Sequence, residues 1–223
     1  MATVIGDVVA SREHADRAGL QRGLGTVLEA VNEAMQPLQP LQVSVGDEFQ
    51  GAFASVGTAA HASLLLRLLL WTGPTQVDSR YGLGLGAVTV FDPDRVPVSQ
   101  DGPGWWAARE AIGRAKQLAG SPRSADVRTY FDAPDALSEL APMVNAFLIC
   151  RDGTVGRMSE RGRRLVLEMM RGRTQLQMAE LEGITQSAVS QNLRASGAFG
   201  LLMAHDLLVV AEPAPDQPDE TRS

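Results

Sequence analysis

The chain has 223 residues, of which 44% are hydrophobic, so it is long enough for one large or two small domains with packed cores. Its formal net charge is −6, and residues 1–150 carry 16 acidic against 11 basic side chains. This balance excludes a protein that binds nucleic acid over its whole surface, so any contact with DNA must be local.

A single cysteine, Cys150, excludes a disulfide framework within the chain and is typical of a reducing compartment. The first residues lack the basic, apolar and cleavage regions of a signal peptide. The most apolar run, residues 64–71, is short and contains Arg67, which favours a core helix over a membrane span. We therefore expect a cytoplasmic protein that does not enter a membrane.

Apolar periodicity and the positions of Gly and Pro predict the order of the elements. We expect, in chain order, a strand at 3–9, a helix at 16–35, strands at 41–46 and 48–54, a helix at 56–71, a strand at 79–90, a loop at 93–104, a helix at 104–118, a strand at 126–131 and a helix at 135–150. The first six regular elements have the β-α-β-β-α-β order of the split βαβ, ferredoxin-like fold. The fold class is therefore α+β.

The domain organisation follows from changes in composition. We expect a ferredoxin-like, palm-type domain over 1–150, a boundary near 151–153, and a small helical domain over 151–212. Residues 213–223 are rich in Pro and acidic side chains, which predicts a disordered tail. Glycines alternate at positions 82, 84 and 86, which indicates close approach of another backbone or of a ligand.

Two acidic positions at strand ends are the strongest indication of chemistry. Asp7 follows Gly6 in the first strand, and Asp47 and Glu48 follow Gly46 at the tip of the predicted hairpin. The ferredoxin-like order places these two points on neighbouring central strands. Unpaired carboxylates are costly to bury, so we expect Asp7 and Asp47 to meet around Mg²⁺ or Mn²⁺, which usually accompanies a nucleotide phosphate.

Each of these residues also has an ordinary structural interpretation. Gly46 and Asp47 are compatible with a type I′ turn, and Asp7 with a helix N-cap or a turn. Glu48 is compatible with a solvated hairpin position, and Arg109 with a surface ion pair. Of the adjacent Trp105 and Trp106, we expect one in the core, and the other is compatible with either the core or stacking on a base.

The sequences GDVVASR at 6–12 and GDEFQG at 46–51 resemble the two signatures of the SatD-like family of bacterial proteins. More weakly, residues 1–130 resemble the class III nucleotide cyclase core, and the hairpin resembles that of diguanylate cyclases. This resemblance implies a bound purine nucleotide with Mg²⁺ or Mn²⁺. It further implies metal ligands at Asp7, Asp47 and Glu48, nucleotide contacts at Ser11, Arg12 and Gly46, and a catalytic Arg109.

Departures from the cyclase pattern leave enzymatic activity open. Trp105 stands where the cyclase helix has its transition-state Asn, and Val43 stands where the hairpin has its base-selecting Lys. A site without these charge stabilisers is expected to lose much of its rate. Nucleotide and metal binding are therefore better supported than turnover.

Residues 175–194 have the pattern of a helix-turn-helix, with a small Ala179, a turn at Gly183 and an N-cap at Thr185. They resemble recognition helices of bacterial regulators. Residues 157–173 add six Arg against two Glu, which are candidates for phosphate contacts. The positions expected to contact double-stranded DNA are Thr185, Gln186, Ser187, Ser190, Gln191 and Arg194.

Three functions are compatible with this sequence. The first is a nucleotide-responsive, DNA-binding transcriptional regulator that acts as a homodimer, because a helix-turn-helix usually reads two half-sites. The second is a metal-dependent nucleotidyl cyclase or transferase. The third is a non-catalytic interaction scaffold with an inert site. The helical domain itself is also compatible with dimerisation or protein contact in place of DNA binding.

Overall fold

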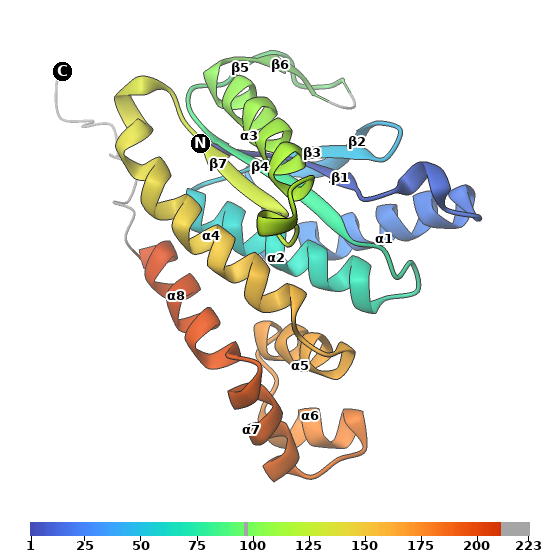
Figure 1. Cartoon of the computed structure of the whole chain (residues 1–223). Coiled ribbons are helices and arrows are strands. Elements are labelled where there is room, and N and C mark those ends of the chain that lie inside the picture. The colour runs from blue at the N-terminus through green and yellow to red at the C-terminus, as the bar shows by residue number, and fades with distance from the viewer. Residues whose placement is uncertain (96–97, 211–223) are drawn as a thin grey trace, which may run out of the picture.

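The computed structural model describes residues 1–95 and 98–210, and its centre is a five-stranded sheet (Figure 1). The strands run in the order β2-β3-β1-β4-β7. The pairs β2–β3, β3–β1 and β1–β4 are antiparallel, and β7 is parallel to β4. This order confirms the predicted α+β, ferredoxin-like fold and adds one strand at the edge. The strands are β1 (Ala2–Val8), β2 (Gln39–Val45), β3 (Glu48–Phe53), β4 (Ser79–Leu85) and β7 (Thr129–Asp132).

Helices cover both faces of this sheet. On one face, α1 (Arg17–Met35) and α2 (Val56–Thr72) bury the even-numbered Val4 and Val8 of β1. On the other, α3 (Pro103–Ala119) packs against β1, β4 and β7, and its Trp105, Ala108 and Ile112 contact Ile5. Because side chains alternate along a strand, the odd-numbered residues of β1 face α3. Asp7 belongs to this set.

The remaining elements are a short hairpin, three 3-10 helices and the C-terminal helices. β5 (Thr89–Asp92) and β6 (Ser99–Asp101) form a two-stranded hairpin ahead of α3. No helix in the described ranges is long and apolar enough to span a bilayer. The other elements are three short 3-10 helices, η1 (Ser11–Glu13), η2 (Pro122–Ser124) and η3 (Asp135–Leu140), and the helices α4 (Ala141–Gly156), α5 (Glu160–Met170), α6 (Gln175–Glu182), α7 (Gln186–Ala195) and α8 (Ala198–Val210).

The alternating glycines of β4 lie directly beneath α3. A Cβ atom on Gly82 would lie 2.1 Å from the carbonyl oxygen of Ala108, and one on Gly84 would lie 2.2 Å from that of Gly104. The prediction of close backbone approach is therefore confirmed, and the approaching backbone is that of α3. This packing brings α3 close to β1 and so to Asp7.

Several predicted element limits are wrong. The predicted strand at 79–90 ends at Leu85, and the chain then enters the separate β5–β6 hairpin, part of which falls in the predicted loop at 93–104. β7 begins at Thr129, because Val127 still closes a turn with Ser124. The predicted helix at 135–150 begins as a 3-10 segment, and α4 proper starts beside Pro142, which suits the first turn of a helix.

The C-terminal helices pack onto the sheet domain through α2 and α4. Both α5 and α8 contact α2, and α8 also contacts α4 (Figure 1). The boundary expected at 151–153 falls inside the continuous α4. The tail predicted at 213–223 lies outside the described residues.

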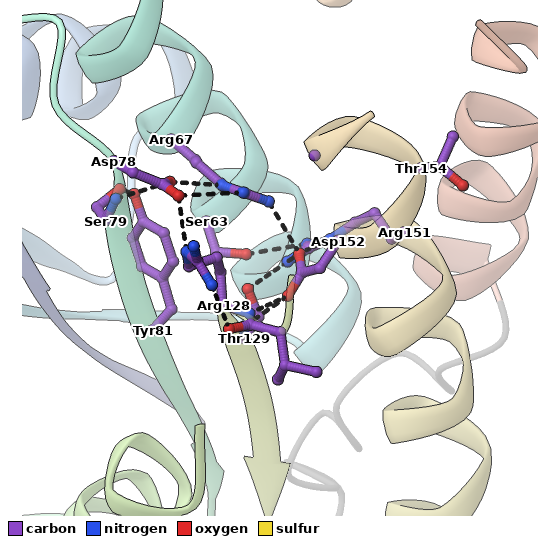
Figure 2. Close-up of polar contacts among 12 residues, drawn as sticks. Ser63, Arg67, Asp78, Ser79, Tyr81, Arg128, Thr129, Arg151, Asp152 and Thr154 are labelled. Carbon is purple, nitrogen blue, oxygen red and sulfur yellow. Dashed lines mark hydrogen bonds and ion pairs between the residues drawn. The ribbon is translucent and has the colours of Figure 1, made fainter. Parts of the chain in front are cut away.

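A buried polar network joins α4 to the sheet and to α2 (Figure 2). Arg151 is 1% exposed, and its Nη1 donates hydrogen bonds to the Ala60 carbonyl at 2.8 Å and to Ser63 Oγ at 3.0 Å. Asp152 Oδ2 accepts the backbone N–H groups of Arg128 and Thr129, at 2.8 and 2.6 Å. These two residues at the predicted boundary therefore lie in the core.

Candidate functional site

Asp7 lies at the C-terminal end of β1, on the face that carries α3. It is the register partner of Arg80 in β4, and the preceding Gly6 pairs with Phe49 in β3. Phe49 is fully buried and lies against Gly6. The end of β1 is therefore held beside the start of β3, next to the hairpin tip.

Asp47 occupies the turn between β2 and β3. Gly46 has a φ of +64°, a backbone conformation that favours glycine, whereas Asp47 is not in the positive-φ region, so the turn is not type I′. Asp47 Oδ2 accepts a hydrogen bond of 3.2 Å from the Val8 N–H, and Gln21 Nε2 of α1 donates one of 2.7 Å to the Gly46 carbonyl. Together these contacts fix the Asp47 carboxylate next to Asp7.

The two aspartates line one cleft of about 430 Å³. Of the residues predicted from the sequence, Ser11, Arg12 and Glu48 also line it, whereas Gly46 and Arg109 are not among its described lining residues. Ser11 and Arg12 come from η1, which follows the left-handed Ala10 at φ +55°. The full lining is Asp7, Val8, Ala10, Ser11, Arg12, Glu13, Val45, Asp47, Glu48 and Lys116.

Lys116 is a basic residue of this cleft that the sequence does not predict. Its Nζ lies 2.5 Å from Asp7 Oδ2, while Arg80 Nη1 lies 4.0 Å from Asp7 Oδ1. Asp7 Oδ1 is buried and has no hydrogen-bond partner among the described residues. Burial raises the pKa of the Asp7 carboxyl despite the charges of Lys116 and Arg80, and the nearby Asp47 adds to that rise.

Glu48 and Arg109 form a close ion pair beside the cleft. Arg109 Nη1 and Nη2 lie 2.5 and 2.8 Å from Glu48 Oε2 and Oε1, and Ser44 Oγ donates to Oε1 at 3.3 Å. The hydrogen bonds from Arg109 hold the pKa of Glu48 below its ordinary value. Because Arg109 occupies both oxygens of Glu48, the aspartates are the better placed pair for a metal.

The donor set fits a hard cation that completes its shell with other ligands. In the described parts of the chain, no three His, Cys, Asp or Glu side chains form a metal cluster. Mg²⁺ does not need such a cage, because it is usually bound by one or two carboxylates together with phosphates and water. Asp7 Oδ1, which has no hydrogen-bond partner among the described residues, is an oxygen ligand of the kind that Mg²⁺ and Mn²⁺ prefer.

The two tryptophans of α3 have different environments. Trp105 is 7% exposed and packs against Ile5, Ala108 and Ile112. Trp106 is 59% exposed, and its Nε1 donates a hydrogen bond of 2.6 Å to Asp101. Of the two, Trp105 is therefore the core residue.

The predicted helix-turn-helix corresponds to α6 and α7. The turn begins at Gly183, which has a φ of +63°, and Thr185 caps α7 by accepting the Ala188 N–H at 3.1 Å. Val189 and Leu193 are fully buried beneath α7. Of the positions predicted to contact DNA, Ser190 is half-buried, and the exposed ones are Thr185, Gln186, Ser187, Gln191 and Arg194.

Most of the arginines predicted to meet phosphates have partners within the chain. Glu182 pairs with Arg161 and Arg164, and Glu168 pairs with Arg171 and Arg173. A fifth, Arg163, stacks on Trp71 with its guanidinium 3.4 Å from the ring centroid. The ion pairs with Glu168 and Glu182 reduce the net positive charge of this segment.

Comparison with known proteins gives a family match and a likeness to solved structures. The model of the SatD family matches residues 1–205. Two structures of a bacterial light-regulated adenylyl cyclase are similar over 52% of this chain, at 14% and 15% sequence identity and a TM-score of 0.43. This chain covers 40% of the first and 70% of the second. No curated protein matches it.

Proposed function

The chain belongs to the SatD family, and we propose that its cleft binds the phosphates of a purine nucleotide through Mg²⁺ or Mn²⁺. The observation that carries this proposal is the convergence of Asp7, from the end of β1, and Asp47, from the β2–β3 turn, on one cleft. Asp7 and Asp47 would hold the cation, and the cation would neutralise phosphate charge. Ser11 and Arg12 of η1 line the same cleft and would receive phosphate oxygens.

Thermal-shift measurements of the full chain test this proposal. We expect purine nucleoside triphosphates with Mg²⁺ or Mn²⁺ to raise the melting temperature by a few degrees, because a ligand that binds the native state stabilises it. Asp7→Asn and Asp47→Asn should remove the metal-dependent part of this shift. Equal nucleotide binding by both variants and the wild type would contradict the metal role and favour an inert scaffold.

We further propose that α7 binds double-stranded DNA and that the nucleotide controls this binding. The supporting observation is the exposed polar surface of α7, where Gln186 and Gln191 are free to reach base edges and Arg194 a phosphate. A helix-turn-helix usually reads two half-sites, so this proposal includes a homodimer.

Electrophoretic mobility shifts with DNA from upstream of the gene, at several salt concentrations, test this second part. We expect salt-sensitive binding that Arg194→Ala weakens across sequences and that Gln186→Ala weakens mainly at the preferred site. The absence of any salt-sensitive shift would contradict the DNA role.

The alternative is metal-dependent nucleotidyl transfer, favoured by the position of Arg109 beside the cleft. Its guanidinium is held by Glu48, so it would have to change partner to stabilise a phosphate. Release of pyrophosphate from a nucleoside triphosphate, followed by mass analysis of the product, would establish this activity. No release from any triphosphate would exclude it.

A further inference from the structure

Two basic side chains of α3 reach the acidic residues of the cleft. Arg109 and Lys116 are seven residues apart, which is about two helical turns, so they project from the same side of α3. Arg109 contacts Glu48, and Lys116 contacts Asp7. A cation from α3 therefore lies against Asp7 at the β1 end and another lies against Glu48 at the hairpin tip.

Opposite charges balance in and beside this cleft. Among the described residues, four carboxylates and four cations line it or pair with its acidic residues. A divalent cation that entered alone would face Lys116 at the Asp7 carboxylate, and a polyphosphate alone would face four carboxylates. Like charges that share a partly buried cleft repel strongly, because water screens them less there. The eight residues are Asp7, Glu13, Asp47, Glu48, Arg12, Arg80, Arg109 and Lys116.

We infer that Lys116 competes with the divalent cation for Asp7, so that the cation binds tightly together with a phosphate chain and weakly without one. This inference rests on the proposed function. When metal and phosphates arrive together, the metal takes over the Asp7 carboxylate, and the Lys116 ammonium transfers to a phosphate oxygen. Lys116 is a positioning residue that couples the two binding events.

The geometry of Lys116 suits this exchange. Its side chain is 45% exposed, whereas that of Asp7 is 14% exposed, so the ammonium is free to move while the carboxylate stays in place. A lysine carries its charge on a flexible four-carbon stem and has no fixed fork, unlike arginine. Asp7 Oδ1 has no hydrogen-bond partner among the described residues, so one oxygen of this buried carboxylate still lacks a close ligand.

Two titrations of the full chain test the competition, one with Mn²⁺ alone and one with Mn²⁺ and inorganic tripolyphosphate, both by calorimetry. Lys116→Met should bind Mn²⁺ alone about five- to tenfold more tightly than the wild type, because the competing charge is gone. The same variant should bind tripolyphosphate with Mn²⁺ about tenfold more weakly. The opposite signs of the two effects distinguish competition from a general loss of structure.

Arg114→Met is the matched control, because it removes one positive charge from the same helix at an exposed position. Arg114 donates a hydrogen bond to Gln117, and we expect the variant to leave both titrations unchanged. Adding Asp7→Asn to Lys116→Met should abolish the gain in Mn²⁺ affinity.

Equal or weaker binding of Mn²⁺ alone by Lys116→Met would overturn the inference. Failure of the proposed function has a different signature, in which the wild type does not bind tripolyphosphate with Mn²⁺. A tighter Mn²⁺ titration of Lys116→Met would support the competition at Asp7 even in that case.

Discussion

Asp7 is central to the proposed site, and on balance its environment disfavours the ionised carboxylate. Burial raises its pKa, and the opposing ion pairs with Lys116 and Arg80 do not fully offset that effect. A carboxyl whose pKa is higher in the folded chain than in the unfolded chain contributes stability at low pH. That contribution is lost as the pH rises through the pKa in the folded chain. Ionisation of Asp7 is therefore less favourable in the folded chain than in the unfolded chain.

We predict that Asp7→Asn raises the melting temperature of the ligand-free chain while removing its metal-dependent shift. An amide keeps the shape of the carboxyl without the cost of burying a charge, and the expected gain is up to about 1 kcal/mol. Differential scanning calorimetry at neutral pH measures it. A lower melting temperature for Asp7→Asn would show that the ion pair with Lys116 outweighs burial.

His205 predicts a pH dependence of stability. It is fully buried beside His61 and Phe147, and neither ring nitrogen has a hydrogen-bond partner among the described residues. Burial, with the charge of Arg151, lowers its pKa from 6.5 to about 2. The unfolded chain therefore binds more protons at this residue between those two values, so the free energy of unfolding falls as the pH drops below 6.5.

The expected slope from His205 is about 1 kcal/mol per pH unit between pH 6.5 and 5. Urea unfolding of the wild type and of His205→Phe over that range measures it, and His61 contributes to both chains. The comparison uses the slope of the free energy of unfolding against pH. A change in stability from the larger phenyl ring that is the same at every pH therefore does not affect it. Identical slopes for the two chains would contradict the buried, neutral state of His205.

At the residue scale, the sequence was informative about the strand-end acids and not about their partners. The alternation of side chains along β1 and the hairpin between β2 and β3 place Asp7 and Asp47 at one end of the sheet. Lys116 could not be assigned, because its position depends on how α3 sits over β4. The sequence feature that could have identified Lys116 is its separation of seven residues from Arg109, which places both on one side of a helix.

At the scale of elements, the contact between β4 and α3 sets the position of the cleft. Gly84→Ala would place a Cβ atom 2.2 Å from the Gly104 carbonyl and 2.4 Å from the Ala108 nitrogen, both backbone atoms. We predict a loss of roughly 2–4 kcal/mol, because α3 must move away from the sheet. The displacement of Lys116 should also weaken binding of metal with tripolyphosphate.

Gly113→Ala is the control on the same helix. No described atom beyond its neighbours lies within 4 Å of the added Cβ, so the change should stabilise α3 by about 1 kcal/mol. Chemical denaturation of both variants gives the comparison. A Gly84→Ala chain as stable as the wild type would mean that α3 does not approach β4 as closely as described.

Elements with strong apolar periodicity were predicted within a few residues, whereas those governed by local turn geometry were not. α1 and α2 lie close to their predicted limits, and Asp16 caps α1 by accepting the Gly19 N–H at 2.8 Å. The predicted start of α4 is too early, because the residues of η3 have a sequence typical of an α-helix. β6 has three residues, too few for an alternating pattern to be recognised.

At the scale of the whole molecule, the buried network around Asp152 holds α4 against α2 and the sheet. Asp152 is fully buried and contacts Arg151 Nη2 at 3.0 Å as well as two backbone N–H groups. We predict that Asp152→Asn costs about 3–5 kcal/mol, because it leaves the cation of Arg151 buried without its carboxylate.

Glu168→Gln is the control for this prediction, since it removes a carboxylate from pairs with the half-exposed Arg171 and Arg173. Its expected cost is below about 1 kcal/mol. Urea unfolding measures both variants. If Asp152→Asn lowered the free energy of unfolding no more than Glu168→Gln does, the buried network would not be what holds α4 against α2 and the sheet.

The most direct test of the proposed site is to locate a metal ion in crystals of the full chain grown with Mn²⁺ and a non-hydrolysable purine nucleoside triphosphate. We predict an anomalous peak at about 2.2 Å from carboxylate oxygens of both Asp7 and Asp47, with the phosphates on its far side. A nucleotide bound elsewhere, or bound with no metal beside either aspartate, would contradict it.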